Sequence, residues 1–203
     1  MPMKRVCVFC GSSPGSRPEY LVKARELGRV LADNKIGLVY GGARIGVMGA
    51  VASAALEAKG EVIGVIPKDL VIKEVAFTDI TDLRVVNSMH ERKALMAELS
   101  DGFIALPGGL GTIEEFFEVL TWAQLGIHKK PCGLLNVSGY FDKIIEFADH
   151  AVQEQFIGPA GRSLILVDDD PAELLKKFQC YQPPAANKVA WALAMANHNI
   201  SKT

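Results

Sequence analysis

The sequence lacks the long apolar run that a membrane-spanning helix needs. No stretch of its 203 residues approaches the roughly 20 consecutive apolar residues that cross a bilayer. The N-terminal segment 1–5 is followed by only a short apolar run before Gly11, which is too short for the core of a signal peptide. We therefore expect a cytoplasmic protein that has no membrane partner.

The sequence also lacks an excess of either charge. Its 22 Lys and Arg residues nearly balance its 23 Asp and Glu residues, which gives a net charge of −1. Proteins that bind nucleic acid through a basic surface usually carry a clear excess of positive charge. We expect no nucleic-acid partner.

Cysteine is scarce, with four residues in the chain. Cys7 and Cys10 form a C-x-x-C within an apolar run that is typical of a strand. Side chains three positions apart on a strand point to opposite faces, so these two thiols cannot share a metal ion or a disulfide. No second C-x-x-C is present to complete a zinc site. We interpret both cysteines as small buried apolar residues.

Two nucleotide-cofactor fingerprints are absent as well. Residues 41–46 (G-G-A-R-I-G) do not match G-x-G-x-x-G, and no acidic residue ends the following strand at the usual ribose position. The sequence contains no G-x-x-x-x-G-K-[ST], so it is not a P-loop hydrolase. We expect neither a cofactor nor a metal ion.

Short apolar runs alternate with helical patterns along the chain. This alternation predicts an α/β fold: a single doubly wound, Rossmann-like domain over 1–182, with a mostly parallel sheet covered by helices on both faces. Residues 183–203 are predicted to form a C-terminal tail with one further helix near 187–197. The expected strands lie near 4–10, 38–40, 62–66, 83–86, 103–106, 132–136 and 164–167, and the expected helices near 18–33, 50–59, 89–99, 112–125, 140–153 and 171–178.

Three loops rich in glycine or serine follow predicted strands, at 11–16, 41–49 and 107–112. In doubly wound sheets, ligands bind beyond the carboxyl ends of the strands. The third loop runs from Pro107 through three glycines into a helix start, where backbone amides lack partners and the helix dipole is positive. The pattern predicts a phosphate site.

Two glutamates follow this turn. Adjacent helical residues point about 100° apart, so Glu114 and Glu115 cannot form a close pair. Glu115 lies off the predicted core stripe, in line with Val119 and Trp122. It is either a helix-start carboxylate favoured by the dipole or an ionised group that faces a pocket or a partner chain. The core stripe is predicted to consist of Ile113, Phe116, Phe117 and Leu120.

Two cations stand at the start of another predicted helix. Ser88 and Glu91 form a capping-box pattern, which places Arg92 and Lys93 in the first turn. Cations prefer helix C-termini, so this position favours a functional role over ordinary surface charge.

These residues together resemble the LOG (LONELY GUY) family of cytokinin riboside 5′-monophosphate phosphoribohydrolases, which are often labelled lysine decarboxylases. The family motif P-G-G-x-G-T-x-x-E matches residues 107–115, and M-x-x-R-K matches residues 89–93. The similarity covers nearly all of 4–178. One departure is Ala43, where the family usually has a third glycine.

The resemblance implies hydrolysis of the N-glycosidic bond of a nucleoside 5′-monophosphate, either a cytokinin nucleotide or AMP, to a free base and ribose 5-phosphate. It implies a homodimer, and it assigns Arg92 and Glu115 as the catalytic pair. The alternative is a carrier or sensor that binds a phosphorylated, nucleotide-like ligand on the same fold without consuming it. The substrate contacts implied by the family are Glu74, Arg92, Lys93, Gly108, Gly109, Leu110, Gly111, Thr112, Ile113, Glu114 and Thr121.

Overall fold

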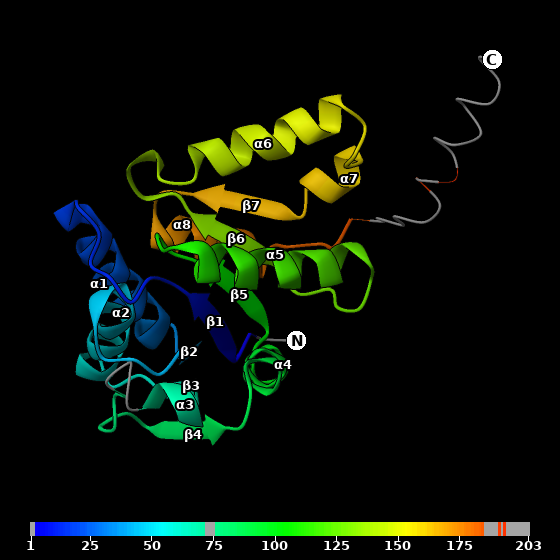
Figure 1. The fold of residues 1–203 in the computed structure, drawn as a ribbon. Coiled ribbons are helices and arrows are strands. Elements are labelled where there is room, and N and C mark those ends of the chain that lie inside the picture. Colours follow the sequence, from blue (N-terminus) through cyan, green and yellow to red (C-terminus); the bar gives the residue numbers. More distant parts are fainter. Residues whose placement is uncertain (1–2, 72–75, 185–190, 192, 194–203) are drawn as a thin grey trace, which may run out of the picture.

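A computed structural model describes residues 3–71, 76–184, 191 and 193. Within these residues, seven strands form one parallel sheet in the order β4-β3-β2-β1-β5-β6-β7 (Figure 1). The strand order reverses between β1 and β5, which creates the crevice where doubly wound sheets bind ligands. The strands are β1 (Arg5–Phe9), β2 (Gly37–Tyr40), β3 (Val62–Pro67), β4 (Asp82–Val86), β5 (Gly102–Ala105), β6 (Cys132–Leu135) and β7 (Ile165–Asp168).

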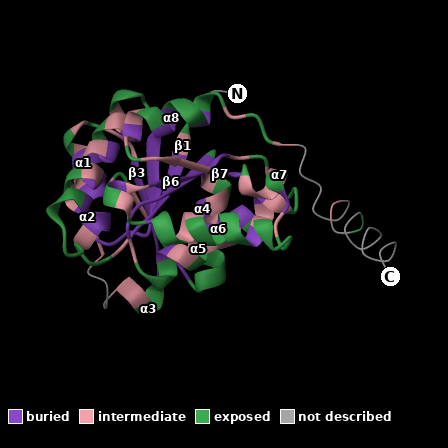
Figure 2. Cartoon of the chain, turned by 90° about the horizontal axis from the view of Figure 1, so that it is seen from above, coloured by how far each residue is buried: buried purple, intermediate pink, exposed green. Residues whose placement is uncertain are grey.

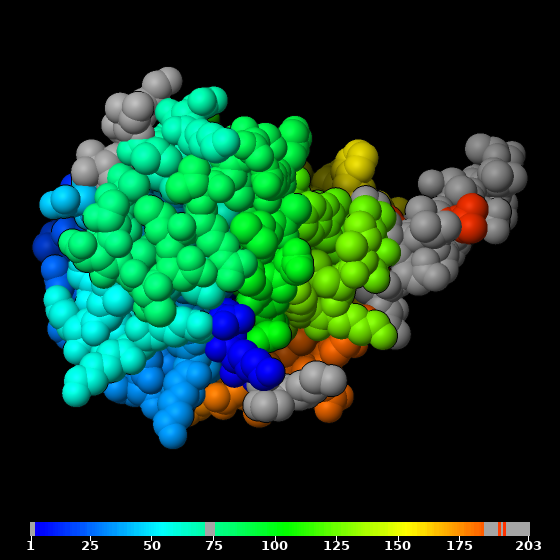
Figure 3. Space-filling view, turned by 90° about the horizontal axis from the view of Figure 1, so that it is seen from below, coloured from blue at the N-terminus to red at the C-terminus, as the bar shows by residue number. Residues whose placement is uncertain are grey.

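Helices cover both faces of this sheet. Buried side chains of α1, α2 and α8 form the core on one face, and those of α4, α5 and α6 form the core on the other (Figure 2). On the surface seen in Figure 3, α4 lies beside β4 and the C-terminal part of α5. The helices are α1 (Pro18–Asp33), α2 (Gly46–Glu57), α3 (Lys68–Val71), α4 (Met89–Leu99), α5 (Leu110–Gln124), α6 (Asp142–Gln153), α7 (Pro159–Arg162) and α8 (Pro171–Gln179), with a 3-10 turn at Val137–Gly139.

The predicted doubly wound fold is confirmed, with small differences at element ends. The helix predicted over 112–125 begins two residues earlier, at Leu110. The short helices α3 and α7 were not predicted, because four residues are too few to show a helical period. The predicted tail at 183–203 lies almost wholly outside the described residues. Among the described helices, none is long and apolar enough to cross a membrane.

The start of α4 is capped by Ser88 as predicted, but the return bond of the capping box reaches Asn87, one residue before the N-cap. The Ser88 Oγ atom accepts a hydrogen bond from the Glu91 amide at 3.1 Å. The Glu91 Oε2 atom accepts one from the Asn87 amide at 2.8 Å. These bonds satisfy amides that have no intrahelical partner. They fix the first turn of α4, which carries Arg92.

The cysteines of the C-x-x-C lie on opposite faces of the sheet, as predicted. Cys7 belongs to the core beneath α4, α5 and α6, whereas Cys10 belongs to the core beneath α1 and α2. Cys7, Cys10 and Cys132 are buried free thiols, and Cys180 is an exposed one. The two thiols of the C-x-x-C therefore contribute packing, as small apolar residues do.

Candidate active site

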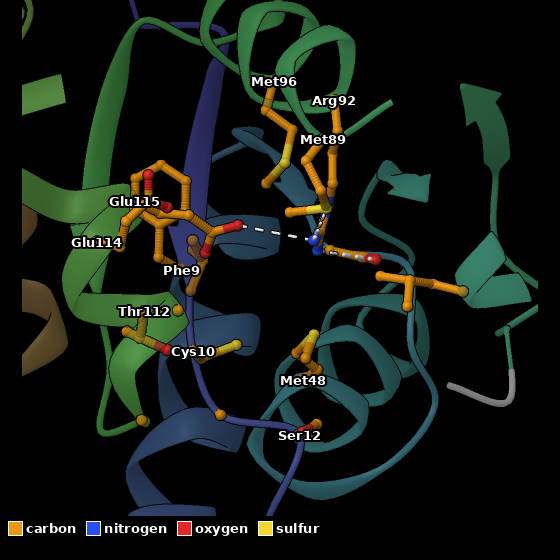
Figure 4. Close-up of a pocket in the computed structure, with 16 residues that line it drawn as sticks. Phe9, Cys10, Ser12, Met48, Met89, Arg92, Met96, Thr112, Glu114 and Glu115 are labelled. Atoms are coloured by element: carbon orange, nitrogen blue, oxygen red, sulfur yellow. Dashed lines mark hydrogen bonds and ion pairs between the residues drawn. The ribbon is translucent and has the colours of Figure 1, made fainter. Parts of the chain in front are cut away.

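A pocket of about 280 Å³ opens at the carboxyl edge of the sheet, where β1 and β5 end (Figure 4). All three loops that the sequence analysis selected contribute to it, which confirms their predicted convergence on one edge. Its lining consists of Val8, Phe9, Cys10, Gly11, Ser12, Gly41, Met48, Leu70, Met89, Arg92, Met96, Gly109, Gly111, Thr112, Glu114 and Glu115.

Arg92 reaches into this pocket from α4 and is only 6% exposed. Its Nε atom donates to the carbonyl of Val65 at 3.0 Å, and its Nη2 atom donates to the carbonyl of Gly41 at 3.3 Å. These carbonyls lie in β3 and directly after β2, so the strand ends hold the guanidinium. A Cβ atom at Gly41 would overlap this guanidinium, which explains the glycine there. Ala43 is fully buried in the core and is not part of the lining, so this departure from the family does not narrow the pocket.

Glu115 faces Arg92 across the pocket from α5. Its Oε1 atom lies 3.7 Å from the Arg92 Nη1 atom, and the two side chains are 11% and 8% exposed. Figure 4 shows both side chains pointing into the same space. Val119, which the sequence analysis placed beside Glu115, is buried within the chain itself. The structure thus brings together the two residues predicted as the catalytic pair; it buries Arg92 and leaves Glu115 only slightly exposed.

Lys93, the neighbour of Arg92, makes a second link between α4 and α5. Its Nζ atom lies 2.6 Å from the Glu114 Oε1 atom and 3.1 Å from the Glu118 Oε1 atom. The hydrogen bond to Glu114 raises the pKa of Lys93, so this amine stays charged. Glu114 lines the pocket, whereas Lys93 does not. No sequence pattern indicated a role for Glu118. Its Oε2 atom is buried without a hydrogen-bond partner in the described structure.

The glycines of the turn differ in what surrounds them. A Cβ atom at Gly108 would overlap the Thr112 side chain and lie 2.7 Å from the amide nitrogen of Gly11. A Cβ atom at Gly109 or Gly111 would meet nothing within 4 Å. Gly109 is the N-cap of α5 and provides no side-chain cap. The fold therefore requires glycine at 108, whereas at 109 and 111 the absence of a side chain keeps the pocket open for a ligand.

We expect Gly111→Ala to separate binding from stability. Alanine is favoured over glycine within a helix by roughly 0.5–1 kcal/mol, so the thermal midpoint should stay the same or rise. Gly111 lines the pocket and an added methyl group would occupy open space beside it, so the KM for a nucleoside monophosphate should increase several-fold. Thermal melts and initial rates measure the two effects. Gly108→Ala is the control, which should lower stability because its methyl group overlaps the fold. An unchanged KM in the Gly111 variant would contradict a ligand at this turn.

Three methionines, Met48, Met89 and Met96, add apolar surface to the lining. Met89 belongs to the M-x-x-R-K match, and Ser12 and Met48 lie in loops that the sequence analysis selected, whereas Met96 had no sequence signal of function. Burial, followed by the charge of Glu115, raises the pKa of the Cys10 thiol, which therefore stays protonated and is a poor nucleophile.

Other implied contacts lie away from this pocket or outside the described residues. Glu74 falls in the undescribed range 72–75. Thr121 is exposed, lies almost two turns beyond Glu115 on α5, and donates its hydroxyl to the Phe117 carbonyl at 2.7 Å. The Ile113 amide donates to the Gly109 carbonyl at 3.2 Å and is therefore already used. In the described ranges, no group of three or more His, Cys, Asp or Glu side chains is placed to hold a metal ion.

Comparison with known proteins gives close relatives. The family described as "Possible lysine decarboxylase" matches residues 48–178. The chain is 49% identical over 193 residues to cytokinin riboside 5′-monophosphate phosphoribohydrolase LOG1 of Arabidopsis thaliana, covering 94% of this chain and 91% of the relative. It is 54% identical over 168 residues to the cytokinin riboside 5′-monophosphate phosphoribohydrolase of Rhodococcoides fascians, covering 82% and 85%.

A solved structure with the same fold is the molybdenum cofactor carrier protein of Chlamydomonas reinhardtii. It is 24% identical, with a TM-score of 0.65, and the match covers 89% of this chain and 100% of that protein. At this identity the likeness shows the fold alone.

Proposed function

The chain belongs to the LOG family, and we propose that it hydrolyses the N-glycosidic bond of nucleoside 5′-monophosphates to a free base and ribose 5-phosphate. The relatives at about half identity are phosphoribohydrolases that act on cytokinin nucleotides by name. The observation that carries the proposal is the ion pair of the buried Arg92 with the slightly exposed Glu115, inside the pocket beside the glycine turn. The decarboxylase description is not supported, because no lysine among the residues that the structure describes lines the pocket to form the Schiff base that pyridoxal phosphate needs.

The glycine turn is the proposed anchor for the 5′-phosphate. Amides in the first turn of α5 have no intrahelical acceptor, and the positive end of the helix dipole favours an anion. An anchored phosphate holds the substrate at a point away from the reacting carbon and reduces the entropy lost in reaching the transition state. Glu115 lies about one turn further along α5, within reach of a ribose whose phosphate rests on the helix start.

Glu115 is the proposed catalytic carboxylate. Cleavage of a ribosyl C–N bond develops positive charge on the sugar, as glycoside hydrolysis does. A carboxylate in a largely buried pocket stabilises this charge more strongly than it would in water. The same carboxylate can orient and deprotonate the water that attacks the anomeric carbon. The C–N bond breaks as the bond from water to the anomeric carbon forms, and the departing base takes up the proton that the water gave to Glu115, which restores the carboxylate.

Arg92 is proposed to hold Glu115 and the sugar in place. Two of its nitrogen atoms are bonded to the carbonyls of Val65 and Gly41, so its orientation is fixed before the substrate binds. The third nitrogen, Nη1, faces Glu115. A guanidinium fixed in this way places a positive charge beside the carboxylate and supplies a donor toward the ribose hydroxyls.

The second candidate is a carrier or sensor that binds a nucleotide intact. The shared fold with a carrier protein permits this alternative, but a pure binding site has no need for a carboxylate facing the sugar.

One assay separates the enzyme from the carrier or sensor. The protein is incubated with AMP and with isopentenyladenosine monophosphate, and free base is measured by chromatography. We expect release from at least one of them, and adenosine, which lacks the phosphate, should be a far poorer substrate. An absence of base from both nucleotides would rule out the enzyme.

We also propose that the protein forms a homodimer through the C-terminal half of α5 and the turn that follows it. Thr121 is exposed on this half of the helix, and Leu125 and Ile127, which lie just beyond its end at Gln124, are 52% and 68% exposed. The family resemblance implies that Thr121 contacts substrate, yet Thr121 lies outside the pocket of its own chain. A second copy that covers this surface would place Thr121 near the substrate of that copy.

The expected mass in sedimentation velocity at micromolar concentration is that of two chains. Leu125→Glu should shift the protein toward monomer and lower its activity, because a charge is placed in an apolar interface. Val22→Glu on α1 is the matched control, since Val22 is 59% exposed and lies on the other layer. A wild-type monomer would contradict the dimer.

A further inference from the structure

A second cavity of about 320 Å³ lies on the other side of the glycine turn and takes no part in the proposed reaction. It shares Gly109 of the turn, and Gly11 and Ser12 of the loop after β1, with the active-site pocket, so these two loops border both cavities. Tyr20 from α1 and Tyr140 from the connection between β6 and α6 line its far side. A contact that orients the turn from this second cavity therefore also affects the active-site pocket.

Tyr140 is bonded to the turn itself. Its hydroxyl donates to the carbonyl oxygen of Gly108 at 2.5 Å, across 32 residues of sequence. The ring is held on two sides: edge-to-face by Tyr20, with centroids 5.6 Å apart, and by Phe141, with centroids 5.1 Å apart. Although Tyr140 is 41% exposed, these two ring contacts and the hydrogen bond orient its hydroxyl toward Gly108.

The loop that carries Tyr140 is built at a conformational cost. Ser138 has a φ of 52°, in the left-handed region that residues other than glycine rarely adopt, and Gly139 follows with a φ of 73°. The side chain of Asn136 stabilises the bend, since its Oδ1 atom accepts from the Phe141 amide at 2.7 Å and its Nδ2 atom donates to Asp142 at 2.8 Å. These contacts direct Tyr140 toward Gly108.

We propose that Tyr140 is a positioning residue for phosphate binding, an inference that rests on the proposed function. The carbonyl of Gly108 and the amide of Gly109 belong to one peptide group. A hydrogen bond received by this carbonyl polarises the group and strengthens the Gly109 N–H as a donor. The bond also fixes the orientation of the peptide, so that its N–H faces the pocket when the phosphate arrives. The Tyr140 hydroxyl therefore acts on the substrate's phosphate through the turn.

Tyr140→Phe tests this role because it removes the hydroxyl and keeps the ring. We expect the dissociation constant for ribose 5-phosphate, measured by titration calorimetry, to rise about fivefold, as the loss of one hydrogen bond predicts. The KM for the nucleotide should rise by a similar factor, whereas kcat should change little, because the phosphate is bound equally in the ground state and the transition state.

Tyr20→Phe is the matched control. It removes a hydroxyl from the same cavity, but no hydrogen bond within the described structure joins Tyr20 to the glycine turn. Thermal midpoints of both variants should stay close to that of the wild type. Equal weakening in the two variants, or unchanged affinity in Tyr140→Phe, would overturn the positioning role while leaving hydrolysis in place. If the wild type releases no base but Tyr140→Phe shows the predicted loss of affinity, hydrolysis alone is overturned. If the wild type binds no ribose 5-phosphate, the positioning role is overturned, and hydrolysis is judged by base release alone.

Discussion

Replacement of Glu115 by glutamine is expected to lower kcat for base release by about a thousandfold, within the range for loss of a positioned acid–base group. The amide has nearly the same shape as the carboxylate, but it cannot stabilise positive charge on the sugar or accept a proton from water. Because Arg92 also bonds to two carbonyls, it stays in place when the charge of Glu115 is removed. The fold should therefore persist, and circular dichroism and the affinity for ribose 5-phosphate should resemble the wild type.

Glu173→Gln is the control for this change. Glu173 lies on α8, where it pairs with Lys176 on the surface, so loss of its charge should leave turnover unaltered. Chromatographic assays at saturating AMP and at saturating isopentenyladenosine monophosphate measure kcat for each variant. If Glu115→Gln turned over like the wild type, Glu115 would not be the catalytic carboxylate.

Replacement of Arg92 by methionine should reduce both activity and stability. The buried carbonyls of Val65 and Gly41 would lose their donors, and Glu115 would lose its nearby positive charge. Removal of one partner from a buried charged network typically costs about 3–5 kcal/mol. We expect a loss at the lower end, about 3 kcal/mol, because the pocket admits water to the freed groups. We expect kcat to fall about a hundredfold, because Glu115 would remain without its positioning partner.

Arg84→Met provides the comparison for stability. Arg84 pairs with Asp82 on the edge strand β4, and its side chain is 40% exposed, so its loss should cost less than about 1 kcal/mol. Urea unfolding gives the free energy of each variant, and initial rates give the activity. An Arg92 variant as stable as Arg84→Met would show that the carbonyl bonds contribute little. Undiminished turnover would remove Arg92 from the mechanism.

Most of the fold follows from local patterns in the sequence. Buried parallel strands appear as short continuous apolar runs, and the capping box fixes the start of α4, so Arg92 could be assigned to its first turn in advance. The start of α5 was placed two residues late because Leu110 and Gly111 follow two glycines, where sequence alone does not predict a helix. Helical phase correctly separated Glu115 from Glu114, but it could not reveal that Val119 is buried within the chain.

The hydrogen bonds and ion pairs that hold the site residues in place could not be predicted in the same way. Arg92 donates to the backbone carbonyls of Val65 and Gly41. Every residue has a backbone carbonyl, so the sequence does not indicate which ones accept these hydrogen bonds. The contact of Glu118 with Lys93 and that of Tyr140 with Gly108 join segments 25 and 32 residues apart. Such pairs depend on how the layers meet, which single-sequence periodicity does not encode.

The amounts of the two products formed from a nucleoside 5′-monophosphate test the central claim most directly. Wild-type protein is incubated with isopentenyladenosine monophosphate and, separately, with AMP, and the free base, the ribose 5-phosphate and the remaining nucleotide are quantified together. Hydrolysis of the N-glycosidic bond predicts that base and ribose 5-phosphate appear in equal amounts as the nucleotide disappears. Recovery of both nucleotides intact, even if the protein binds them, would contradict it.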